Sequence, residues 1–297
     1  MATVGGSILP DILVSTNWLA AHLTDPELRV LDIRGYVNTT DLGGGRQAAE
    51  YVAARDEYDA GHVPGAAYVD WTTDITDPND PVKVQIAPPD RFARAMEERG
   101  VGDDRDVVIV DHTGGHFATR LWWALRFYGH ERAAVLDGGF KKWKAEGRPV
   151  TATVPTFPPA RFTPRLRPAL RVTAADVLAA VDDATTTIVD ARDAGQFRGE
   201  VARGPRVGHI PGAINVAAKQ LMNDDGTWKP LAAQRRILVD GGVRPAQRVI
   251  AYCNGGVTAT AVLFALQRLG YTDYANYDGS WNEWGDRAEL PVEQGSD

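Results

Sequence analysis

The sequence repeats itself at a long interval, and this repeat constrains the chain to two copies of one domain. The matching segments are 31–34 (LDIR) with 189–192 (VDAR), 61–66 (GHVPGA) with 208–213 (GHIPGA), and 135–143 (VLDGGFKKW) with 276–284 (NYDGSWNEW). A long-period repeat of this kind predicts that one structural unit occurs twice. The 297 residues are also about the length of two domains.

Within each copy, short apolar runs alternate with segments of helical periodicity. The expected strands are 30–33, 67–70, 107–110, 187–190 and 249–252. The expected helices are 16–23, 90–99, 119–128, 174–181 (after a capping box at Thr173), 234–239 and 259–269. This alternation predicts an α/β fold with two tandem domains, each built from a mainly parallel sheet flanked by helices.

A proline-rich stretch separates the two copies. We expect an N-terminal domain over residues 10–150, a linker over 151–170 and a C-terminal domain over 171–297. The prolines of the linker are Pro155, Pro158, Pro159, Pro164 and Pro168. Because proline cannot continue a helix, the linker is expected to be extended.

Charge and cysteine content exclude several functional classes. The net charge of −7 disfavours nucleic acid or an anionic membrane as a partner, so an anionic substrate would need a local positive site. A single cysteine excludes an internal disulfide, a Cys₄ zinc site and a resolving cysteine. We expect neither a metal nor a cofactor. No apolar run is as long as a membrane span, and no secretory leader is recognisable, so we expect a cytoplasmic protein.

The single cysteine lies in a setting that favours chemistry. Cys253 follows the expected strand 249–252, and a loop containing Gly255 and Gly256 leads to the helix 259–269. Backbone N–H groups of such a loop, with a helix N-terminus behind them, favour a thiolate, which is a nucleophile. The alternative is an inert core cysteine, which is common but has no need of a glycine-containing loop.

Together these motifs resemble the rhodanese superfamily, specifically its tandem two-domain sulfurtransferases, over about residues 14–291. The resemblance implies a rhodanese fold in each half, a non-catalytic N-terminal domain and a catalytic cysteine loop in the C-terminal domain. At the offset of the repeat, His112 takes the place of Cys253, so the first copy has no thiol there.

The resemblance also implies the reaction. The Cys253 thiolate would take sulfane sulfur from a small anionic donor, thiosulfate or 3-mercaptopyruvate, and become a persulfide. The sulfur would pass to a thiol, such as thioredoxin or a small thiol, or to cyanide. The residues expected to hold the thiolate and the persulfide through their N–H groups are Asn254, Gly255, Gly256, Val257 and Thr258. The Thr258 hydroxyl could add a hydrogen bond or cap the helix that follows.

Two departures from the family pattern concern the donor. The loop is neutral and ends in Gly-Val-Thr, as in mercaptopyruvate-preferring relatives, but Gly255 stands where those have serine. Gln196 stands where many relatives have a substrate-binding arginine. Arg203 and Arg206 are the first candidates to replace that arginine, followed by Arg198. Each of these arginines could equally be a solvated surface residue.

Two other functions compete with sulfur transfer. A cysteine phosphatase or arsenate reductase would need a loop one residue longer with an arginine in it, and the segment after Cys253 contains none. A non-enzymatic persulfide carrier or regulatory rhodanese module is compatible with the missing basic residues.

Several further residues are expected to be structural. His62 and His209 recur in both copies and are interpreted as loop-fixing hydrogen bonders, and Asp190 with Arg192 is interpreted as a structural ion pair, like Asp32 with Arg34.

Overall fold

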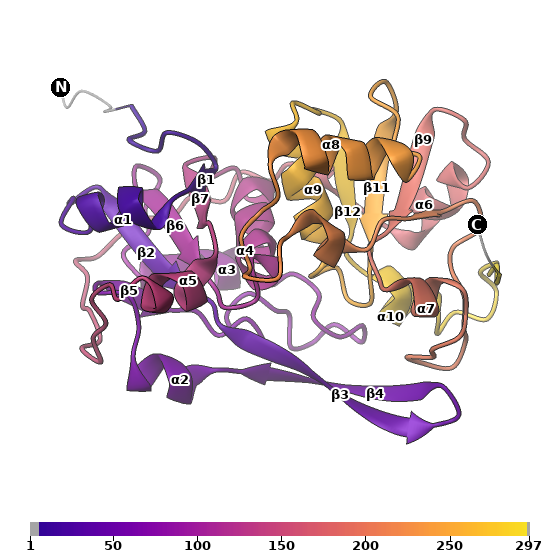
Figure 1. Cartoon of the computed structure of the whole chain (residues 1–297), viewed down its shortest axis with the longest axis horizontal. Coiled ribbons are helices and arrows are strands. Elements are labelled where there is room, and N and C mark those ends of the chain that lie inside the picture. Colours follow the sequence, from indigo (N-terminus) through magenta and orange to yellow (C-terminus); the bar gives the residue numbers. More distant parts are fainter. Residues whose placement is uncertain (1–5, 296–297) are drawn as a thin grey trace.

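The computed structural model describes residues 6–295 and contains two domains that lie side by side (Figure 1). Two expectations fall partly on residues 1–5 and 296–297, which lie outside the described residues. They are the absence of a leader at the N-terminus and the C-terminal bound of the second domain. Among the described residues, no helix is long and apolar enough to cross a membrane.

Domain 1 contains a five-stranded parallel sheet in the order β1-β7-β6-β2-β5. Its strands are β1 (Leu13–Val14), β2 (Leu28–Asp32), β5 (Ala66–Tyr68), β6 (Asp106–Val110) and β7 (Ala133–Leu136). Its helices are α1 (Thr16–His22), α2 (Arg55–Ala60), α3 (Pro89–Glu97), α4 (His116–Phe127) and α5 (Gly139–Ala145).

Domain 2 repeats this topology with a sheet in the order β10-β9-β11-β12-β8, again parallel throughout. Its strands are β8 (Arg171–Val172), β9 (Thr186–Asp190), β10 (Ile214–Asn215), β11 (Arg248–Tyr252) and β12 (Tyr274–Tyr277). Its helices are α6 (Ala174–Ala180), α7 (Ala194–Phe197), α8 (Leu231–Asp240), α9 (Ala259–Arg268) and α10 (Ser280–Trp284), with short 3₁₀ turns at Pro168–Leu170 and Ala218–Leu221. The expected fold class is therefore confirmed.

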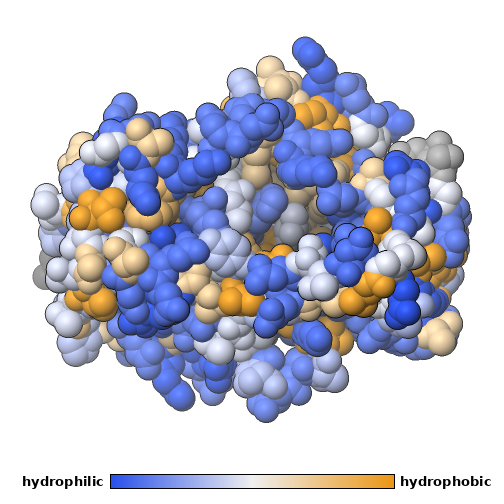
Figure 2. Space-filling view, turned by 60° about the horizontal axis from the view of Figure 1, so that its bottom comes forward, coloured by the Kyte–Doolittle hydropathy of each residue, from blue (hydrophilic) through white to orange (hydrophobic). Residues whose placement is uncertain are grey.

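A long hairpin in domain 1 was not expected from the sequence. Strands β3 (Gly35–Gly43) and β4 (Arg46–Ala53) pair antiparallel and extend along one side of the molecule towards domain 2 (Figure 1). The tip contacts domain 2 through Gln47 N–H donating to Ala202 O and Ala202 N–H donating to Gly45 O, both at 2.8 Å. Figure 2, in which this side is turned forward, shows a mostly hydrophilic surface that is hollowed near its middle.

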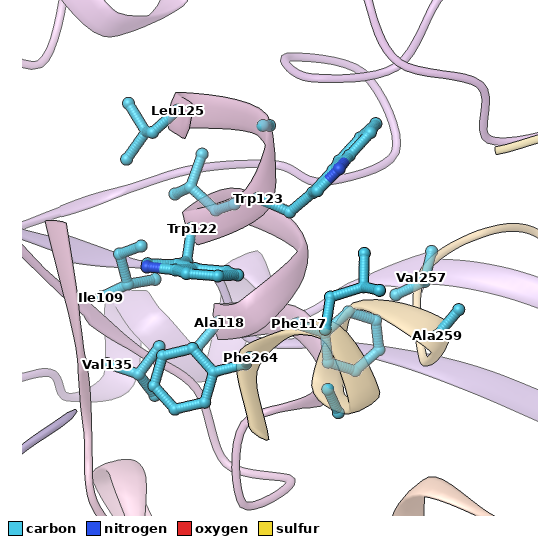
Figure 3. Close-up of a cluster of buried hydrophobic side chains, with 14 of the residues drawn as sticks. Ile109, Phe117, Ala118, Trp122, Trp123, Leu125, Val135, Val257, Ala259 and Phe264 are labelled. Atoms are coloured by element: carbon cyan, nitrogen blue, oxygen red, sulfur yellow. The ribbon is translucent and has the colours of Figure 1, made fainter. Parts of the chain in front are cut away.

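The two domains share one hydrophobic core through helices α4 and α9. The rings of Trp122 and Phe264 meet edge to face at 5.0 Å, and Figure 3 shows them packed together with further apolar residues of both helices. The hydroxyls of Thr119 and Thr260 form a buried hydrogen bond of 2.9 Å. This continuous core fixes domain 1 against the loop that carries Cys253.

Candidate active site

Cys253 lies between strand β11 and helix α9, at the carboxyl edge of the domain 2 sheet. It is buried, with 3% of its surface exposed. Most carbonyl groups of its loop are held from outside. Trp281 N–H donates to Cys253 O at 3.0 Å, and Asn282 N–H donates to Asn254 O at 2.8 Å. Residues of α10 therefore hold the first turn of the loop.

The N–H groups of the same loop have no acceptor. Among residues 6–295, no protein group accepts a hydrogen bond from the backbone N–H of residues 254–258. Successive N–H groups without partners, followed by the start of α9, form a site for an anion. The Cys253 N–H itself is used structurally, because it donates to Ser280 Oγ at 3.1 Å.

The corresponding loop of domain 1 is located by strand register. In domain 1, Asp32 of β2 lies opposite Val110 of β6. In domain 2 the repeat-equivalent Asp190 of β9 lies opposite Tyr252 of β11. The residue that follows Val110 therefore corresponds to the residue that follows Tyr252.

Asp111, and not His112, thus occupies the position of Cys253. A second contact agrees, because Phe140 N–H donates to Asp111 O just as Trp281 N–H donates to Cys253 O. The sequence-based match of His112 with Cys253 was wrong by one residue, because the domain 1 loop is one residue longer before its helix.

The carboxylate of Asp111 fills its own loop. It accepts four backbone N–H groups, from Thr113 at 3.2 Å, Gly115 at 3.0 Å, Phe117 at 3.0 Å and Ala118 at 3.1 Å. Domain 1 therefore shows what this loop holds when the residue at its centre is negatively charged. The thiol of Cys253 occupies the equivalent position in domain 2.

Domain 1 covers the cysteine loop. A Cβ atom built on Gly255 would lie 2.5 Å from Val84 Cγ2, 3.0 Å from Asn282 Nδ2 and 3.7 Å from the Tyr51 hydroxyl. Asn282 Nδ2 also donates to the Tyr51 hydroxyl at 3.1 Å, and this bond joins strand β4 to helix α10. Val84 is held at φ = 60°, which is rare for a β-branched residue. The cover is therefore built from closely packed and partly strained residues.

A cleft of about 590 Å³ opens on the outer side of this cover. Tyr51 and Asn282 border both the cleft and the loop, whereas Cys253 does not line the cleft. Other residues that line the cleft are Gln47, Lys83, Arg203, Trp281 and Arg287. Two acidic side chains, Glu283 and Asp286, line it as well, and Arg287 is paired with Glu283 and Glu289. The positive charge of the cleft therefore comes from Lys83 and Arg203.

Of the four residues expected to bind a donor, only Arg203 lines this cleft. Its Nε donates to Gln47 Oε1 at 3.1 Å. Burial lowers the pKa of Arg203, while Tyr51, Asp193 and Cys253 act in the opposite direction. Arg203 is thus within electrostatic reach of Cys253 and stays cationic, given the high starting value.

The structure places the other three candidates elsewhere. Arg206 donates to the carbonyl oxygens of residues 284, 285, 287 and 290, so it ties down the C-terminal segment. Arg198 pairs with Glu200 at 2.7 Å on the surface. Gln196 is buried in α7, and its Oε1 has no hydrogen-bond partner among the described residues.

Different constraints favour glycine at the two glycine positions of the loop. Gly256 adopts φ = 69°, and a Cβ atom there would lie 2.7 Å from Asp278 O. Gly255 is limited instead by Val84 of domain 1. Thr258 occupies the N-cap position of α9, but its side chain makes no capping hydrogen bond, so the capping role that was one alternative is not observed.

The expected structural residues are confirmed. Arg192 pairs with Asp190 at 2.6 Å, and Arg34 pairs with Asp32 at 2.9 Å. His62 Nδ1 bonds Tyr58 O at 2.8 Å. His209 makes the equivalent bond to Phe197 O, also at 2.8 Å. Among residues 6–295, no group of three or more His, Cys, Asp or Glu residues is arranged to hold a metal ion.

Some functional neighbours were not identified from the sequence. Ser280, Tyr51 and Val84 reach the loop only through tertiary contacts. Arg120 reaches it from α4 and donates to Gly256 O. A signal for Arg120 was present, because it is a charged residue inside the apolar stretch 117–125, where a buried ion pair is the usual explanation.

The fold and the site together define the class of protein. The chain contains two equivalent parallel α/β domains, and the same loop follows a carboxylate in one domain and a thiol in the other. A family model described as a rhodanese-like domain matches residues 15–146 and again 173–287. The chain therefore belongs to the rhodanese family, and the resemblance seen in its motifs is confirmed.

Relatives of known name resemble the chain over nearly all of its length. The 3-mercaptopyruvate sulfurtransferase of Escherichia coli K12 is 36% identical over 283 residues, which are 94% of this chain and 97% of the relative. The thiosulfate sulfurtransferase of Rattus norvegicus is 36% identical over 300 residues, 97% of each chain. The sulfur carrier protein TtuD of Thermus thermophilus is 33% identical over 301 residues, 97% of this chain and 98% of TtuD.

A solved structure agrees in fold. The crystal structure of SseA from Escherichia coli, described with the rhodanese fold and the mechanism of 3-mercaptopyruvate sulfotransferases, superposes with a TM-score of 0.80. It is 33% identical and covers 91% of this chain and 98% of SseA.

Proposed function

We propose that this protein is a sulfurtransferase in which Cys253 carries sulfane sulfur as a persulfide. The donor is a small anion, thiosulfate or 3-mercaptopyruvate, and the acceptor is a thiol, such as thioredoxin or a small thiol, or cyanide. Domain 1 (residues 10–150) is the non-catalytic half, domain 2 (171–297) is the catalytic half, and residues 151–170 link them. The cytoplasmic location expected from the sequence belongs to this proposal.

The observation that carries the proposal is the occupied loop of domain 1. Asp111 satisfies four N–H groups there with a carboxylate. In domain 2 the loop N–H groups have no protein acceptor among the described residues, and Cys253 stands at the position of Asp111. A thiolate or persulfide anion on Cys253 would satisfy them in the same way.

The chemistry follows from the thiolate. With thiosulfate, the Cys253 thiolate attacks the outer sulfur, the S–S bond breaks, and sulfite leaves with the bonding electron pair. With 3-mercaptopyruvate, the C–S bond breaks, and the enolate that leaves takes the thiol proton to become pyruvate. The persulfide then gives its outer sulfur to cyanide, forming thiocyanate, or to a thiolate, forming a new persulfide, and the Cys253 thiolate is regenerated.

The loop alone carries little positive charge, so the donor needs a second contact. Arg203 is the residue we assign to the anionic donor, because it lines the cleft above the loop and stays cationic. Arg198, Arg206 and Gln196, the other sequence candidates, are engaged or buried away from the cleft lining. A guanidinium there would bind a carboxylate or a sulfonate oxygen pair.

A persulfide carrier is the second candidate. It is favoured by the burial of Cys253, which is 3% exposed beneath Val84, Tyr51 and Asn282. A cover of this kind protects a persulfide from solvent, and a partner protein would have to displace it. The carrier predicts a stable persulfide with slow turnover on small acceptors.

The test is sulfur transfer from thiosulfate and from 3-mercaptopyruvate, each with cyanide and with a dithiol as acceptor. Cys253→Ser is the matched control, because it removes the single thiol of the chain. Cysteine-dependent turnover with one preferred donor supports the enzyme. A sulfur adduct on Cys253, seen by mass spectrometry without turnover, supports the carrier. Neither turnover nor adduct in the folded protein contradicts both functions.

A further inference from the structure

One carbonyl of the cysteine loop is held from the other domain. Gly256 O accepts a hydrogen bond from Arg120 Nη1 at 3.1 Å and another from Asn276 Nδ2 at 3.0 Å. Asn276 belongs to β12 of domain 2, whereas Arg120 belongs to α4 of domain 1. Figure 3 shows the start of α4, with Phe117, next to the segment that carries Val257.

Three further contacts fix the guanidinium of Arg120 in place. It forms a buried ion pair with Asp278, and its Nη2 donates to Val84 O at 3.0 Å. It also lies over the ring of Trp123, 4.7 Å from the ring centre. Arg120 is 2% exposed, so water does not replace these contacts. A group held this firmly can set the orientation of the peptide to which it donates.

The orientation of that peptide decides where the Val257 N–H points. In a trans peptide the C=O and the following N–H point in opposite directions, and the structure has no cis peptide bonds among its described residues. Gly256 O points to Arg120 and Asn276, so the Val257 N–H points the other way. That N–H has no protein acceptor among the described residues. Gly256, at φ = 69°, imposes little restraint of its own, because glycine reorients readily.

We propose that Arg120 is a positioning residue for the chemistry at Cys253. It holds the Gly256–Val257 peptide with its N–H towards the sulfur anion, from a domain that has no thiol of its own. This inference rests on the proposed function of Cys253. It differs from a purely structural role, in which the pair with Asp278 would only join the domains.

The experiment compares Arg120→Lys with Arg126→Lys in the full chain. Lysine at residue 120 keeps a positive charge beside Asp278 but cannot reach Gly256 O, Asp278 and Val84 O at once. Arg126 is a matched control on the same helix, because it also crosses the domain interface, donating to Gln267 Oε1 at 3.2 Å. The readout is the ultraviolet absorbance of the thiolate against pH, with Cys253→Ser subtracted. Urea unfolding of each variant is measured in parallel.

We expect Arg120→Lys to raise the midpoint of thiolate formation by about one pH unit, a tenfold loss of preference for the anion, since one charge-assisted hydrogen bond is weakened. With a donor, kcat falls and KM changes little. Arg126→Lys follows the wild type in both measurements. A lower stability of Arg120→Lys with an unchanged thiolate midpoint would overturn the proposal and leave only the structural role.

A second variant protects the test against misfolding. Asn276→Leu removes the other donor to Gly256 O and leaves Arg120 in place. Among the described residues, its only other loss is the long 3.5 Å bond from Asn276 Nδ2 to Asp278 Oδ1, and we expect a midpoint shift in the same direction. An unshifted midpoint in this variant, as in Arg120→Lys, contradicts the inference. The thiolate titration needs no donor or acceptor, so it gives its answer even if wild-type sulfur transfer fails, and the two failures remain distinguishable.

Discussion

At the scale of single residues, Asp111 and Cys253 explain each other. Both follow a central parallel strand, and Asp111 accepts N–H groups of the loop that comes after it. In domain 1 the carboxylate of Asp111 accepts four N–H groups of its loop. In domain 2 a thiol takes the same place, and sulfur can also form a bond to a second sulfur. One side chain thus distinguishes the two loops.

Gly255 shows how domain 1 limits the composition of the loop. Gly255→Ser would place a Cβ atom 2.5 Å from Val84 Cγ2, so we expect the free energy of unfolding to fall by about 1–3 kcal/mol. Val84→Gly removes the methyl groups and the strained φ, and we expect the double variant to recover about 1 kcal/mol or more of this loss. Urea unfolding of all four proteins measures the coupling.

The control for this cycle is Gly195→Ser in α7, where a Cβ atom would make only ordinary contacts at 3.4 and 3.5 Å. Its effect should add to that of Val84→Gly. Strict additivity for Gly255→Ser as well would mean that Val84 is not what excludes a serine from the loop.

Arg203 is the residue that we expect to determine donor affinity. Arg203→Met removes a cation from the cleft, and the KM for thiosulfate or 3-mercaptopyruvate should rise about tenfold or more, because a charge-assisted bond is lost. Steady-state kinetics with both donors provide the measurement. Arg55→Met, which breaks an exposed ion pair with Asp59 on α2, should leave KM unchanged. Equal KM values for wild type and Arg203→Met would remove Arg203 from the donor site.

At the scale of elements, the hairpin β3–β4 is the largest difference between the two domains. It carries Tyr51 to the cysteine loop and Gln47 to Arg203. Domain 2 has only the short helix α7 after its equivalent strand β9. Domain 1 thus supplies one wall of the cleft.

We expect Tyr51→Phe to loosen the cover over Cys253. The variant loses the hydrogen bond from Asn282, so iodoacetamide should alkylate the single cysteine several-fold faster, as the loss of one neutral hydrogen bond allows. Mass spectrometry follows the reaction. Tyr36→Phe is the matched control, because Tyr36 lies on the same hairpin and bonds Glu57 instead. Equal alkylation rates in all three proteins would show that the Tyr51–Asn282 bond does not control access.

The elements also show what could be predicted from the sequence. The strands around Cys253 and around residues 107–110 were predicted because each is a short, fully buried apolar run. The hairpin was missed because β3 is exposed along most of its length and has no apolar face to reveal it. The edge strands β1 and β8 are two residues each, too short for a pattern.

The same limit applies to the site. The thiol, its loop and Arg203 were accessible from local motifs. Arg120 carried a signal as a charged residue in an apolar stretch, but its contact with the loop did not, because Gly256 lies 136 positions further along the sequence. Val84 likewise reaches the loop only through the tertiary fold. The equivalence of Asp111 with Cys253 could be recognised only from the strand register. A constant sequence offset misaligns the two loops, because the domain 1 loop is one residue longer.

At the scale of the whole molecule, histidines that are wholly or partly buried make stability depend on pH. Burial lowers the pKa of His112, His116 and His130, so these side chains bind protons less readily in the folded chain than in the unfolded chain. Below about pH 6.5 the unfolded chain binds protons that the folded chain does not. The free energy of unfolding should therefore fall between pH 7.5 and 5.5, as measured by urea unfolding.

His130→Gln tests whether His130 contributes to this pH dependence. Because glutamine does not titrate, the free energy of unfolding of the variant should fall less between pH 7.5 and 5.5. Burial raises the pKa of Asp32 and Asp74, which stabilises the fold as pH falls and so acts in the opposite direction. A slope that is identical in wild type and His130→Gln would exclude His130 as a cause.

The contact between Thr119 and Thr260 has a consequence for how such a chain can diverge. Each is the repeat equivalent of the other, and so are Arg126 and Gln267, so the helices meet about a local two-fold axis, as in a symmetric dimer. In a dimer of identical subunits, every substitution at this axis would be made twice. Fusion into one chain removes that coupling: Arg120 contacts the loop of Cys253, while its counterpart is the small Ala261. Duplication thus freed one copy to specialise in supporting the other.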